Sequence, residues 1–488
     1  MRFNESPLKN RALGGLVAAL VAAIVAVLVS TVAIALPAPN LDQLITQLSA
    51  PNAEDRALAA CEIAETRKGD VSRAAPALLA LLSDGTPVEG RLCRDKRHWG
   101  NWRETSSPGR EAAVALDRVG QAAIEPLIEK LKAPSDFARE HAALALGFIE
   151  SSRTIEPLIA TLDDEIAPVR ARAAWALGMI EHASAVPKLG RAVVADADAE
   201  VREQAAWALG MIEDAGAVEP LAGALEDATF EVREQAAWAL GMIEDAGAVE
   251  PLARALEDPE DAVRKQAAWA LGMIEASSAV PALSRALEDP QIEVREQAAW
   301  ALGMIEASSA VDPLVTALAD AHSEVRQQAA WALGMIEASS AVEGLVAALG
   351  DSDSEVRKQA AWGLGMIESP AAVDGLLNAL RDEEAGVREQ TAWALGMIES
   401  AAAVNGLIPA LQDASAEVRK QVAWALGMIE DGRAIEALTD VLADDDADVR
   451  QQVLWAISRC AENHHGDVDY PALAEELRRA LRAERNDA

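Results

Sequence analysis

The sequence of 488 residues predicts an all-α solenoid, a stack of two-helix repeats preceded by one hydrophobic N-terminal helix. Three observations predict this fold. Tryptophan recurs every 31 residues over most of the chain, the segment VREQAAWALGMIE occurs three times, and one apolar stretch near the N-terminus carries no charge. Self-similarity at a fixed period indicates a solenoid, because each repeat buries its apolar face only against its neighbours.

Composition and charge exclude several classes of protein. The formal net charge is −36, with 43 basic against 79 acidic residues. A nucleic-acid binder would need an excess of basic residues to neutralise phosphates, so no nucleic-acid partner is expected. A hydrophobic fraction of 51% argues against general disorder. Three cysteines are too few for a disulfide-dense scaffold or a Cys-type zinc cluster.

The first element is the charge-free stretch from Leu13 to Leu36, which is long enough to cross a bilayer as a helix. Three basic residues precede it, and none follows until Arg56. The positive-inside rule therefore predicts a cytoplasmic tail over residues 1–12, a transmembrane helix over 13–36 and an extracytoplasmic remainder, periplasmic or at the cell surface in a bacterium. A long cleaved signal sequence is the alternative, because Ala33-Ile34-Ala35 resembles a cleavage site, and the protein would then be secreted.

The repeats are expected to run from residue 41 to 485. Leu144, Val114 and Cys61 take the place of the tryptophan in upstream copies, which gives about thirteen repeats. The tryptophans themselves are Trp175, Trp207, Trp238, Trp269, Trp300, Trp331, Trp362, Trp393, Trp424 and Trp455.

Each repeat is predicted to contain a short helix followed by a long one. Asp-Pro pairs such as Asp258-Pro259 and Asp289-Pro290 are expected to be an N-cap followed by a proline in the first turn. No stretch shows sustained alternation of apolar and polar residues, so no sheet is expected.

These residues resemble a known family. The pattern V-R-x-x-A-A-x-A-L-G-x-I, followed by A-V-x-P-L, is similar to the short HEAT-like repeat of the phycobilin-lyase type. The resemblance covers Leu41 to about Arg485. It implies a right-handed α-solenoid of about 13 two-helix HEAT-like repeats of 31 residues, in which the Val-Arg helix lines the concave side.

The long helix around Trp238 has three faces when its residues are placed about 100° apart. One face is apolar and is predicted to form the core: Val232, Ala236, Ala239, Leu240 and Ile243. A second stripe is turned away from this core and carries Glu231, Gln235, Trp238 and Met242. The remaining flank, Ala237 and Gly241, is small. We expect an indole to reach across to the flank of the next repeat, because packed helices lie about 8–10 Å apart.

Two interpretations of the tryptophan stripe stay open. The indoles and thioethers either fill the grooves between repeats or form a contact strip on the concave surface, and the two roles overlap. Carboxylates beside them make the strip acidic, so the expected partner is a cationic or amphipathic protein or peptide. The candidate binding residues are Trp175, Trp207, Trp238, Trp269, Trp300, Trp331, Trp362, Trp393, Trp424, Met211, Met242, Met273, Met304, Met335, Gln235, Gln266 and Gln297.

The repeated arginines, such as Arg202, Arg233 and Arg264, could form an anion-binding row. An Arg–Asp ladder between repeats is the favoured interpretation, because an acidic turn precedes each arginine, as Glu226-Asp227 precedes Arg233.

The repeat period breaks over residues 83–107, a surface insertion that carries Cys93. Cys61 and Cys93 are 32 residues apart, about one repeat, and in an exported protein we predict a disulfide between them. Cys460 is expected to be buried as a small hydrophobic residue. Residues 466–488 are predicted to form a charge-rich C-terminal cap.

No pattern points to catalysis, and no catalytic residue, metal ligand or cofactor is predicted. The sequence lacks HExxH, a glycine-rich phosphate loop and G-x-S-x-G. The predicted function is a membrane-anchored, non-enzymatic scaffold that binds a protein or peptide. One alternative is the extracytoplasmic sensor part of a membrane signalling system similar to metallopeptidase-type sensors. Another is a lyase-like or ligand-carrying protein, which the family resemblance implies.

Overall fold

The computed structural model describes residues 40–66, 70–89 and 105–462, and almost all of these residues are in helices or in the turns between them. They belong to two compact units, the first ending at Thr161 and the second beginning at Leu162. In both units short and long helices alternate along the chain. The described residues contain thirteen long helices, of 12 to 16 residues each, which equals the number of repeats that the sequence predicts.

The first unit contains three of the long helices. These are α3 (Ala53–Glu65), α5 (Pro108–Val119) and α7 (Asp136–Ile149). Its short helices are α2 (Leu41–Gln47), α4 (Ala75–Leu81), α6 (Ile124–Lys130) and α8 (Ile155–Thr161). The 3₁₀ turns are η1 (Ser72–Ala74), η2 (Gly120–Ala123) and η3 (Ser152–Thr154).

The ends of the insertion pair as a small antiparallel ribbon, β1 (Val88–Glu89) with β2 (Thr105–Ser106). The expectation of no sheet is wrong at this place, because two residues are too short a stretch to show a period in sequence. A buried polar group lies beside the ribbon. The Nδ1 of His141 is 2.8 Å from the carbonyl oxygen of Leu82, and Nε2 is 3.5 Å from Ser107 Oγ.

The second unit contains the other ten long helices. These are α9 (Ala167–Ile180), α11 (Ala199–Ile212), α13 (Phe230–Ile243), α15 (Asp261–Ile274), α17 (Ile292–Ile305), α19 (Ser323–Ile336), α21 (Ser354–Ile367), α23 (Ala385–Ile398), α25 (Ala416–Ile429) and α27 (Ala447–Glu462). The short helices are α10 (Val186–Ala195), α12 (Val218–Ala224), α14 (Val249–Ala255), α16 (Val280–Ala286), α18 (Val311–Ala317), α20 (Val342–Ala348), α22 (Val373–Ala379), α24 (Val404–Leu407) and α26 (Ile435–Asp440).

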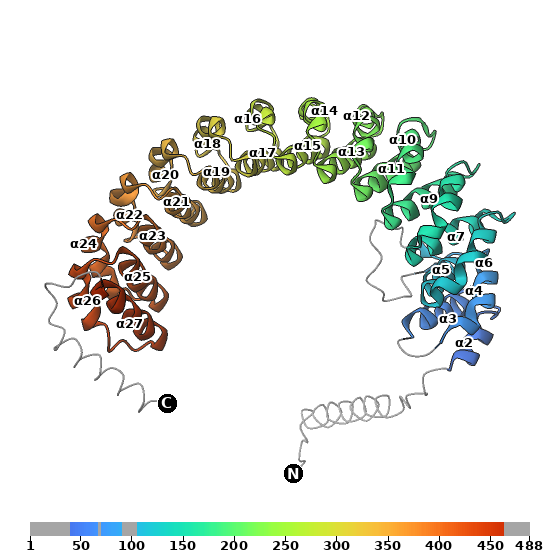
Figure 1. Cartoon of the computed structure of the whole chain (residues 1–488), viewed down its shortest axis with the longest axis horizontal. Coiled ribbons are helices and arrows are strands. Elements are labelled where there is room, and N and C mark those ends of the chain that lie inside the picture. The colour runs from blue at the N-terminus through green and yellow to red at the C-terminus, as the bar shows by residue number, and fades with distance from the viewer. Residues whose placement is uncertain (1–39, 67–69, 90–104, 463–488) are drawn as a thin grey trace, which may run out of the picture. The chain divides into compact units, whose positions relative to one another are not determined.

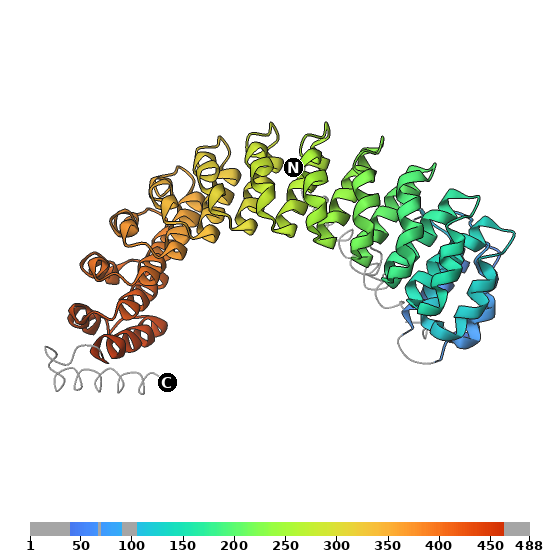
Figure 2. The same ribbon diagram turned by 45° about the horizontal axis from the view of Figure 1, so that its top comes forward.

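A 3₁₀ turn leads into each short helix of this unit. These turns are η4 (Ala183–Ala185), η5 (Ala215–Ala217), η6 (Ala246–Ala248), η7 (Ser277–Ala279), η8 (Ser308–Ala310), η9 (Ser339–Ala341), η10 (Pro370–Ala372), η11 (Ala401–Ala403) and η13 (Gly432–Ala434), and η12 (Ile408–Gln412) follows α24. Figure 1 shows the short helices of this unit as an outer layer and the long helices as an inner layer, and Figure 2 shows the same two layers from another direction.

The core of each repeat lies between its two helices. Val232, Ala236, Ala239 and Leu240 on α13 are fully buried, as predicted, whereas Ile243 is half-buried. Leu221 on α12 and Leu252 on α14 are also fully buried. Alanines on the long helix let the backbones approach closely, and the leucines of the short helices fill the space between the layers.

Each long helix from α7 to α25 ends on a glutamate in the left-handed backbone region. Their φ angles lie between 50° and 55°, as in Glu244 at the end of α13. Glycine usually takes this position because it has no Cβ to clash with the following carbonyl. The left-handed residue reverses the chain and directs it into the 3₁₀ turn.

Neighbouring short helices pack through pairs of side chains that differ in size. Between α10 and α12, Gly190 faces Pro220, and a methyl group on that glycine would lie 3.1 Å from the proline Cγ. Between α18 and α20 the order is reversed, because Val315 faces Gly344. Further along, Val346 faces Gly375 and Leu377 faces Gly406. The larger side chain therefore lies on the later helix at the α10–α12 joint and on the earlier helix at the three joints from α18 to α24.

The Asp-Pro pairs do not cap the long helices. Helix α15 begins at Asp261 with Glu260 as its N-cap, and Asp258-Pro259 lies in the turn before it. The Asp258 carboxylate instead accepts a hydrogen bond from the backbone N–H of Glu260, at 2.9 Å. It also accepts a hydrogen bond from Arg233 on the preceding long helix. Asp289 has the same role before α17. The prediction was wrong because an Asp side chain can accept a backbone hydrogen bond in a turn as readily as at the N-terminus of a helix.

Membrane anchoring is not supported. No helix among the described residues is both long and apolar enough to cross a membrane. The longest of them, α27, has 16 residues and is about 24 Å long, less than a bilayer core of about 30 Å. The predicted span Leu13–Leu36 lies outside the described residues. The predicted localisation was a single-pass membrane protein with a cytoplasmic N-terminus and exported repeats, or a secreted protein. We withdraw this prediction. The predicted tail (1–12) and cap (466–488) also lie outside the described residues.

Candidate functional site

One face of the long helices from α11 to α25 stays open. Helix α13 contacts α11 on one side, α15 on the other and the short helix α12 behind it. The face that remains carries Gln235, Trp238 and Met242, and all three side chains are half-buried. Because the sequence repeats, the same three residue types occupy this face from α11 to α25. We call these rows of Trp, Met and Gln the ladder face.

The structure places the candidate binding residues on this face in equivalent positions. Sixteen of the seventeen are half-buried, and Trp175, on α9, is the exception at 6% exposed. Half-burial leaves part of each indole, thioether and amide accessible along the inner layer. Trp455 on α27, which the sequence analysis did not include among the candidates, is 37% exposed.

The tryptophans also join the repeats. A methyl group on Gly241 of α13 would lie 2.6 Å from Cζ3 of Trp269 on α15, so the indole rests directly on the glycine. The same contact joins Gly210 to Trp238 and Gly272 to Trp300. We predicted that an indole reaches the next repeat, and this direction is wrong: each indole contacts the preceding repeat. The reason is that the side chain of a helical residue points toward the N-terminus of its helix and, here, toward the earlier neighbour.

The amides of the glutamine row are available for binding. Gln235, Gln266 and Gln297 have no hydrogen-bond partner within the part of the chain that the structure describes. Each amide can donate and accept, which matches the groups of a polypeptide backbone. Beside them, the thioethers of Met242 and Met273 offer adaptable apolar contact.

The arginines form the predicted ladder between repeats, but each forms its ion pair with the aspartate of the turn that precedes the next long helix and not with the turn that precedes its own. Arg233 donates to both carboxylate oxygens of Asp258, from Nε at 2.7 Å and from Nη2 at 2.8 Å. Its Nη1 donates to the backbone carbonyl of Asp227 at 2.8 Å. Corresponding pairs recur through the unit: Arg170–Asp196, Arg202–Asp227, Arg264–Asp289, Arg295–Asp320, Arg326–Asp351, Arg357–Asp382, Arg388–Asp413 and Arg419–Asp444. The arginines are therefore engaged in packing the repeats, and the anion-binding interpretation is wrong.

These pairs keep the aspartates ionised. In Asp413 and Asp444, hydrogen bonds from Arg388 and Arg419 have the largest effect and lower the pKa of each carboxyl group. In Asp227 burial alone would raise the pKa, but hydrogen bonds from Arg202 and from the backbone of Thr229 outweigh it, and the pKa falls.

Carboxylates beside the ladder face behave in the opposite way. Burial raises the pKa of Glu203, and the nearby Glu200, Glu231 and Glu234 raise it further. Burial also raises the pKa of Glu234, together with Glu231, while Lys265 opposes the shift. These carboxylates repel one another, and a cation between them would relieve the repulsion.

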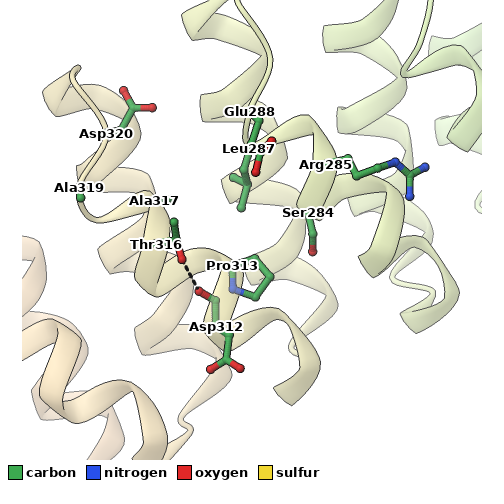
Figure 3. A pocket seen from close by; sticks show the side chains of 10 residues that line it. All are labelled: Ser284, Arg285, Leu287, Glu288, Asp312, Pro313, Thr316, Ala317, Ala319 and Asp320. Atoms are coloured by element: carbon green, nitrogen blue, oxygen red, sulfur yellow. Dashed lines mark hydrogen bonds between the residues drawn. The ribbon is translucent and has the colours of Figure 1, made fainter.

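A groove of about 680 Å³ lies on the outer layer between α16 and α18. Figure 3 shows Pro313 and Leu287 facing the groove, while the guanidinium of Arg285 and the carboxylate of Asp312 point away from it. Sequence reasoning missed this groove. The only signal was the small Ser284 opposite Pro313, at a position where the next four repeats have a branched aliphatic residue.

The cysteines and histidines of residues 40–66, 70–89 and 105–462 belong to no cluster of metal-ligating side chains. No group of three or more His, Cys, Asp or Glu side chains that could hold a metal occurs among the described residues. Cys460 is buried as predicted, and burial raises the pKa of its thiol to about 11. Cys61 is buried in α3, whereas Cys93 lies outside the described residues, so the disulfide between them stays a prediction.

Comparison with known proteins identifies the family of the repeats. The family model for HEAT repeats matches residues 109–178, 155–241, 186–271, 219–303, 249–334, 311–390 and 373–458, which confirms the resemblance to HEAT-like repeats. No curated protein matches the chain.

Several solved structures share the fold. Kap121p bound to Pho4p is similar with 14% identity and a TM-score of 0.55, over 92% of this chain and 55% of Kap121p. Kap95p, in a structure with RanGDP, is similar with 15% identity and a TM-score of 0.51, over 87% of this chain and 67% of Kap95p. The CpcE–CpcF complex of phycocyanin lyase from Nostoc matches 50% of this chain and 94% of that chain at 24% identity, but its TM-score of 0.30 supports no argument.

Proposed function

Because the chain belongs to the HEAT-repeat family, we propose that it is a non-enzymatic scaffold that binds a protein or peptide on the ladder face. One observation carries the proposal. From α11 to α25 the same Trp, Met and Gln side chains recur on the open face of the inner layer, and all are half-buried. The tryptophans are needed for the joints between repeats, but those joints do not require the methionines and unbonded glutamine amides that share the same face.

The residue types suit a polypeptide partner. Aromatic residues dominate the binding energy of protein interfaces, and methionine adapts to irregular apolar surfaces. The glutamine amides can bind a backbone without regard to its sequence. The acidic side chains along the row favour a cationic or amphipathic partner. The likeness to Kap121p, seen in complex with Pho4p, agrees with this use of the fold, although at 14% identity it supports the fold alone.

Site-specific photo-crosslinking on the full-length protein tests this function. A photoreactive amino acid replaces Gln266 on the ladder face, and in a matched variant it replaces Glu219, which is exposed on the outer helix α12. In cells that naturally produce the protein, crosslinks to one polypeptide are expected from position 266 and not from position 219. Adding Met242→Lys and Met273→Lys should then abolish the crosslink, because each would bury a charge at the interface. Equal crosslinking from both positions would overturn the proposal.

A further inference from the structure

The ladder face combines constant and variable positions. Gln occupies the position three residues before each ladder tryptophan from α11 onwards, in a framework that is almost identical in every repeat. The residue just before that glutamine varies in charge. Along the chain this variable row reads Glu203, Glu234, Lys265, Glu296, Gln327, Lys358, Glu389 and Lys420. Since the residues around this row are almost identical in each repeat, the local sequence does not explain why its charge changes.

Helices α11 and α13 form a pair of neighbours with unbalanced acidic charge. Each carries a second glutamate one turn earlier, Glu200 on α11 and Glu231 on α13, and both are exposed. Within the described residues, none of the four carboxylates Glu200, Glu203, Glu231 and Glu234 forms an ion pair, and the one basic side chain that acts on them is Lys265, which lowers the pKa of Glu234.

Later repeats neutralise the same position. On α21, Lys358 lies 2.5 Å from Glu355, and on α25 Lys420 pairs with Glu417. The lysine of each pair stands in the variable row, and the glutamate one turn earlier is retained. The acidic pair is therefore compensated at α21 and α25 and uncompensated at α11, α13 and α17, of which only α11 and α13 are neighbours.

We infer that α11 and α13 bind the basic segment of an extended polypeptide, whose backbone continues along the glutamine row toward α25. This inference rests on the proposed function, because it assumes that the ladder face binds a polypeptide. Charge complementarity supports it: two adjacent helices present four unpaired carboxylates next to half-buried indoles, a surface suited to lysine or arginine side chains. The mutual repulsion of Glu203 and Glu234 with their neighbours is relieved when a cation lies between them.

The test uses full-length protein and two synthetic 20-residue probes. One peptide contains lysine, leucine and serine, and in the other every lysine is replaced by glutamate. The test variant combines Glu200→Gln, Glu203→Gln, Glu231→Gln and Glu234→Gln. A control variant with the same net charge carries Glu219→Gln, Glu226→Gln, Glu257→Gln and Glu343→Gln, all of them exposed and outside the ladder face. The control is essential because a chain of net charge −36 attracts any cation.

Fluorescence anisotropy of the labelled basic peptide should show binding to the parent protein, weakened about fivefold or more in the test variant and less than about twofold in the control. Binding should also weaken as the pH falls, because Glu203 and Glu234 take up protons at a higher pH than ordinary glutamates. Equal weakening in both variants, or no weakening in the test variant, would overturn the inference.

A third variant separates this inference from the proposed function. Gln235→Ala, Gln266→Ala and Gln297→Ala remove the amides and leave the carboxylates in place. If these changes weaken both peptides while the Glu→Gln variant leaves the basic peptide unaffected, the inference fails and the proposed function stands. If neither set of changes alters the binding of either peptide, both fail.

Discussion

The indole of Trp238 rests on Gly210, the glycine that ends the alanine-rich part of the preceding long helix. A methyl group on Gly210 would lie 2.7 Å from Cζ3 of this indole and 2.9 Å from the Cα of Ala239. The contact brings two long helices closer than ordinary side chains allow. It also explains why the tryptophan and the glycine recur together: each half of the pair belongs to a different repeat.

Gly241→Ala should therefore destabilise the protein. Alanine in place of a helical glycine normally stabilises by about 0.5–1 kcal/mol. Here the new Cβ would lie 2.6 Å from Cζ3 of Trp269, and overpacking of this kind costs about 1–3 kcal/mol. Urea denaturation followed by tryptophan fluorescence measures the effect. Gly223→Ala is the control, because its Cβ would meet only Val194 Cγ2 at 3.7 Å and should not destabilise. A gain in stability for both variants would contradict the close contact.

Arg264→Lys should weaken the joint between α15 and α17, although it keeps the charge. Lysine cannot reproduce the two parallel hydrogen bonds to Asp289 together with the bond to the Asp258 carbonyl. We expect a loss of about 1–2 kcal/mol in the free energy of unfolding. Arg254→Lys, in an exposed pair with Glu250, should change it by less than about 0.5 kcal/mol. Similar losses at both positions would show that the bidentate geometry is unimportant.

The arginine ladder should make stability depend on pH in the acid range. Hydrogen bonds from Arg388 and Arg419 lower the pKa of Asp413 and Asp444 in the folded protein below the ordinary value of 3.8. The stabilisation is present above that value and is lost as the pH falls through the folded-state pKa. Asp413→Asn should therefore be less stable than the parent at pH 7, and the difference should shrink below about pH 4. Denaturation midpoints measured across this range would disprove the linkage if the difference stayed constant.

Glu244→Gly should stabilise the protein by about 1 kcal/mol. Glu244 holds φ at 55°, where a residue with a Cβ costs about 1–2 kcal/mol, and its negative charge sits at the unfavourable end of the helix. Part of the gain is lost because glycine is more flexible in the unfolded chain. Glu219→Gly, in the helical backbone of α12, should instead destabilise by about 0.5–1 kcal/mol. The two thermal unfolding midpoints should move in opposite directions, and a shared direction would contradict the strain at Glu244.

The period of the sequence was enough to predict the long helices and their buried face. Val232, Ala236 and Leu240 lie where a period of 3.6 residues places them, and the arginine ladder followed from charge alone. Two features could not be read this way. Whether Trp238 contacts the preceding or the following repeat depends on the direction in which side chains tilt along a helix. The left-handed Glu244 depends on the 3₁₀ turn that follows it, and no residue preference signals a glutamate in that position.

The candidate site was predictable in its residues and less so in its arrangement. Rows of Trp, Met and Gln follow from the repeat, and the structure places them on one open face. The sequence did not show which carboxylates lie next to a basic side chain. Lys358 and Lys420 resemble scattered surface charges until the structure shows them paired with Glu355 and Glu417.

The uneven bulk between neighbouring short helices makes some of these repeats poorly interchangeable. The long helices are so alike that a module displaced by one step, during folding or by recombination of its coding sequence, would still complete the inner layer. The outer layer would reject a module moved from the α10–α12 joint to the α18–α20 joint, although it would accept one moved between the two valine–glycine joints α18–α20 and α20–α22. Val315 accepts Gly344 as its neighbour, and a proline such as Pro220 in that place would collide with it. Side chains far from the ladder face thus distinguish some of the otherwise equivalent modules from one another.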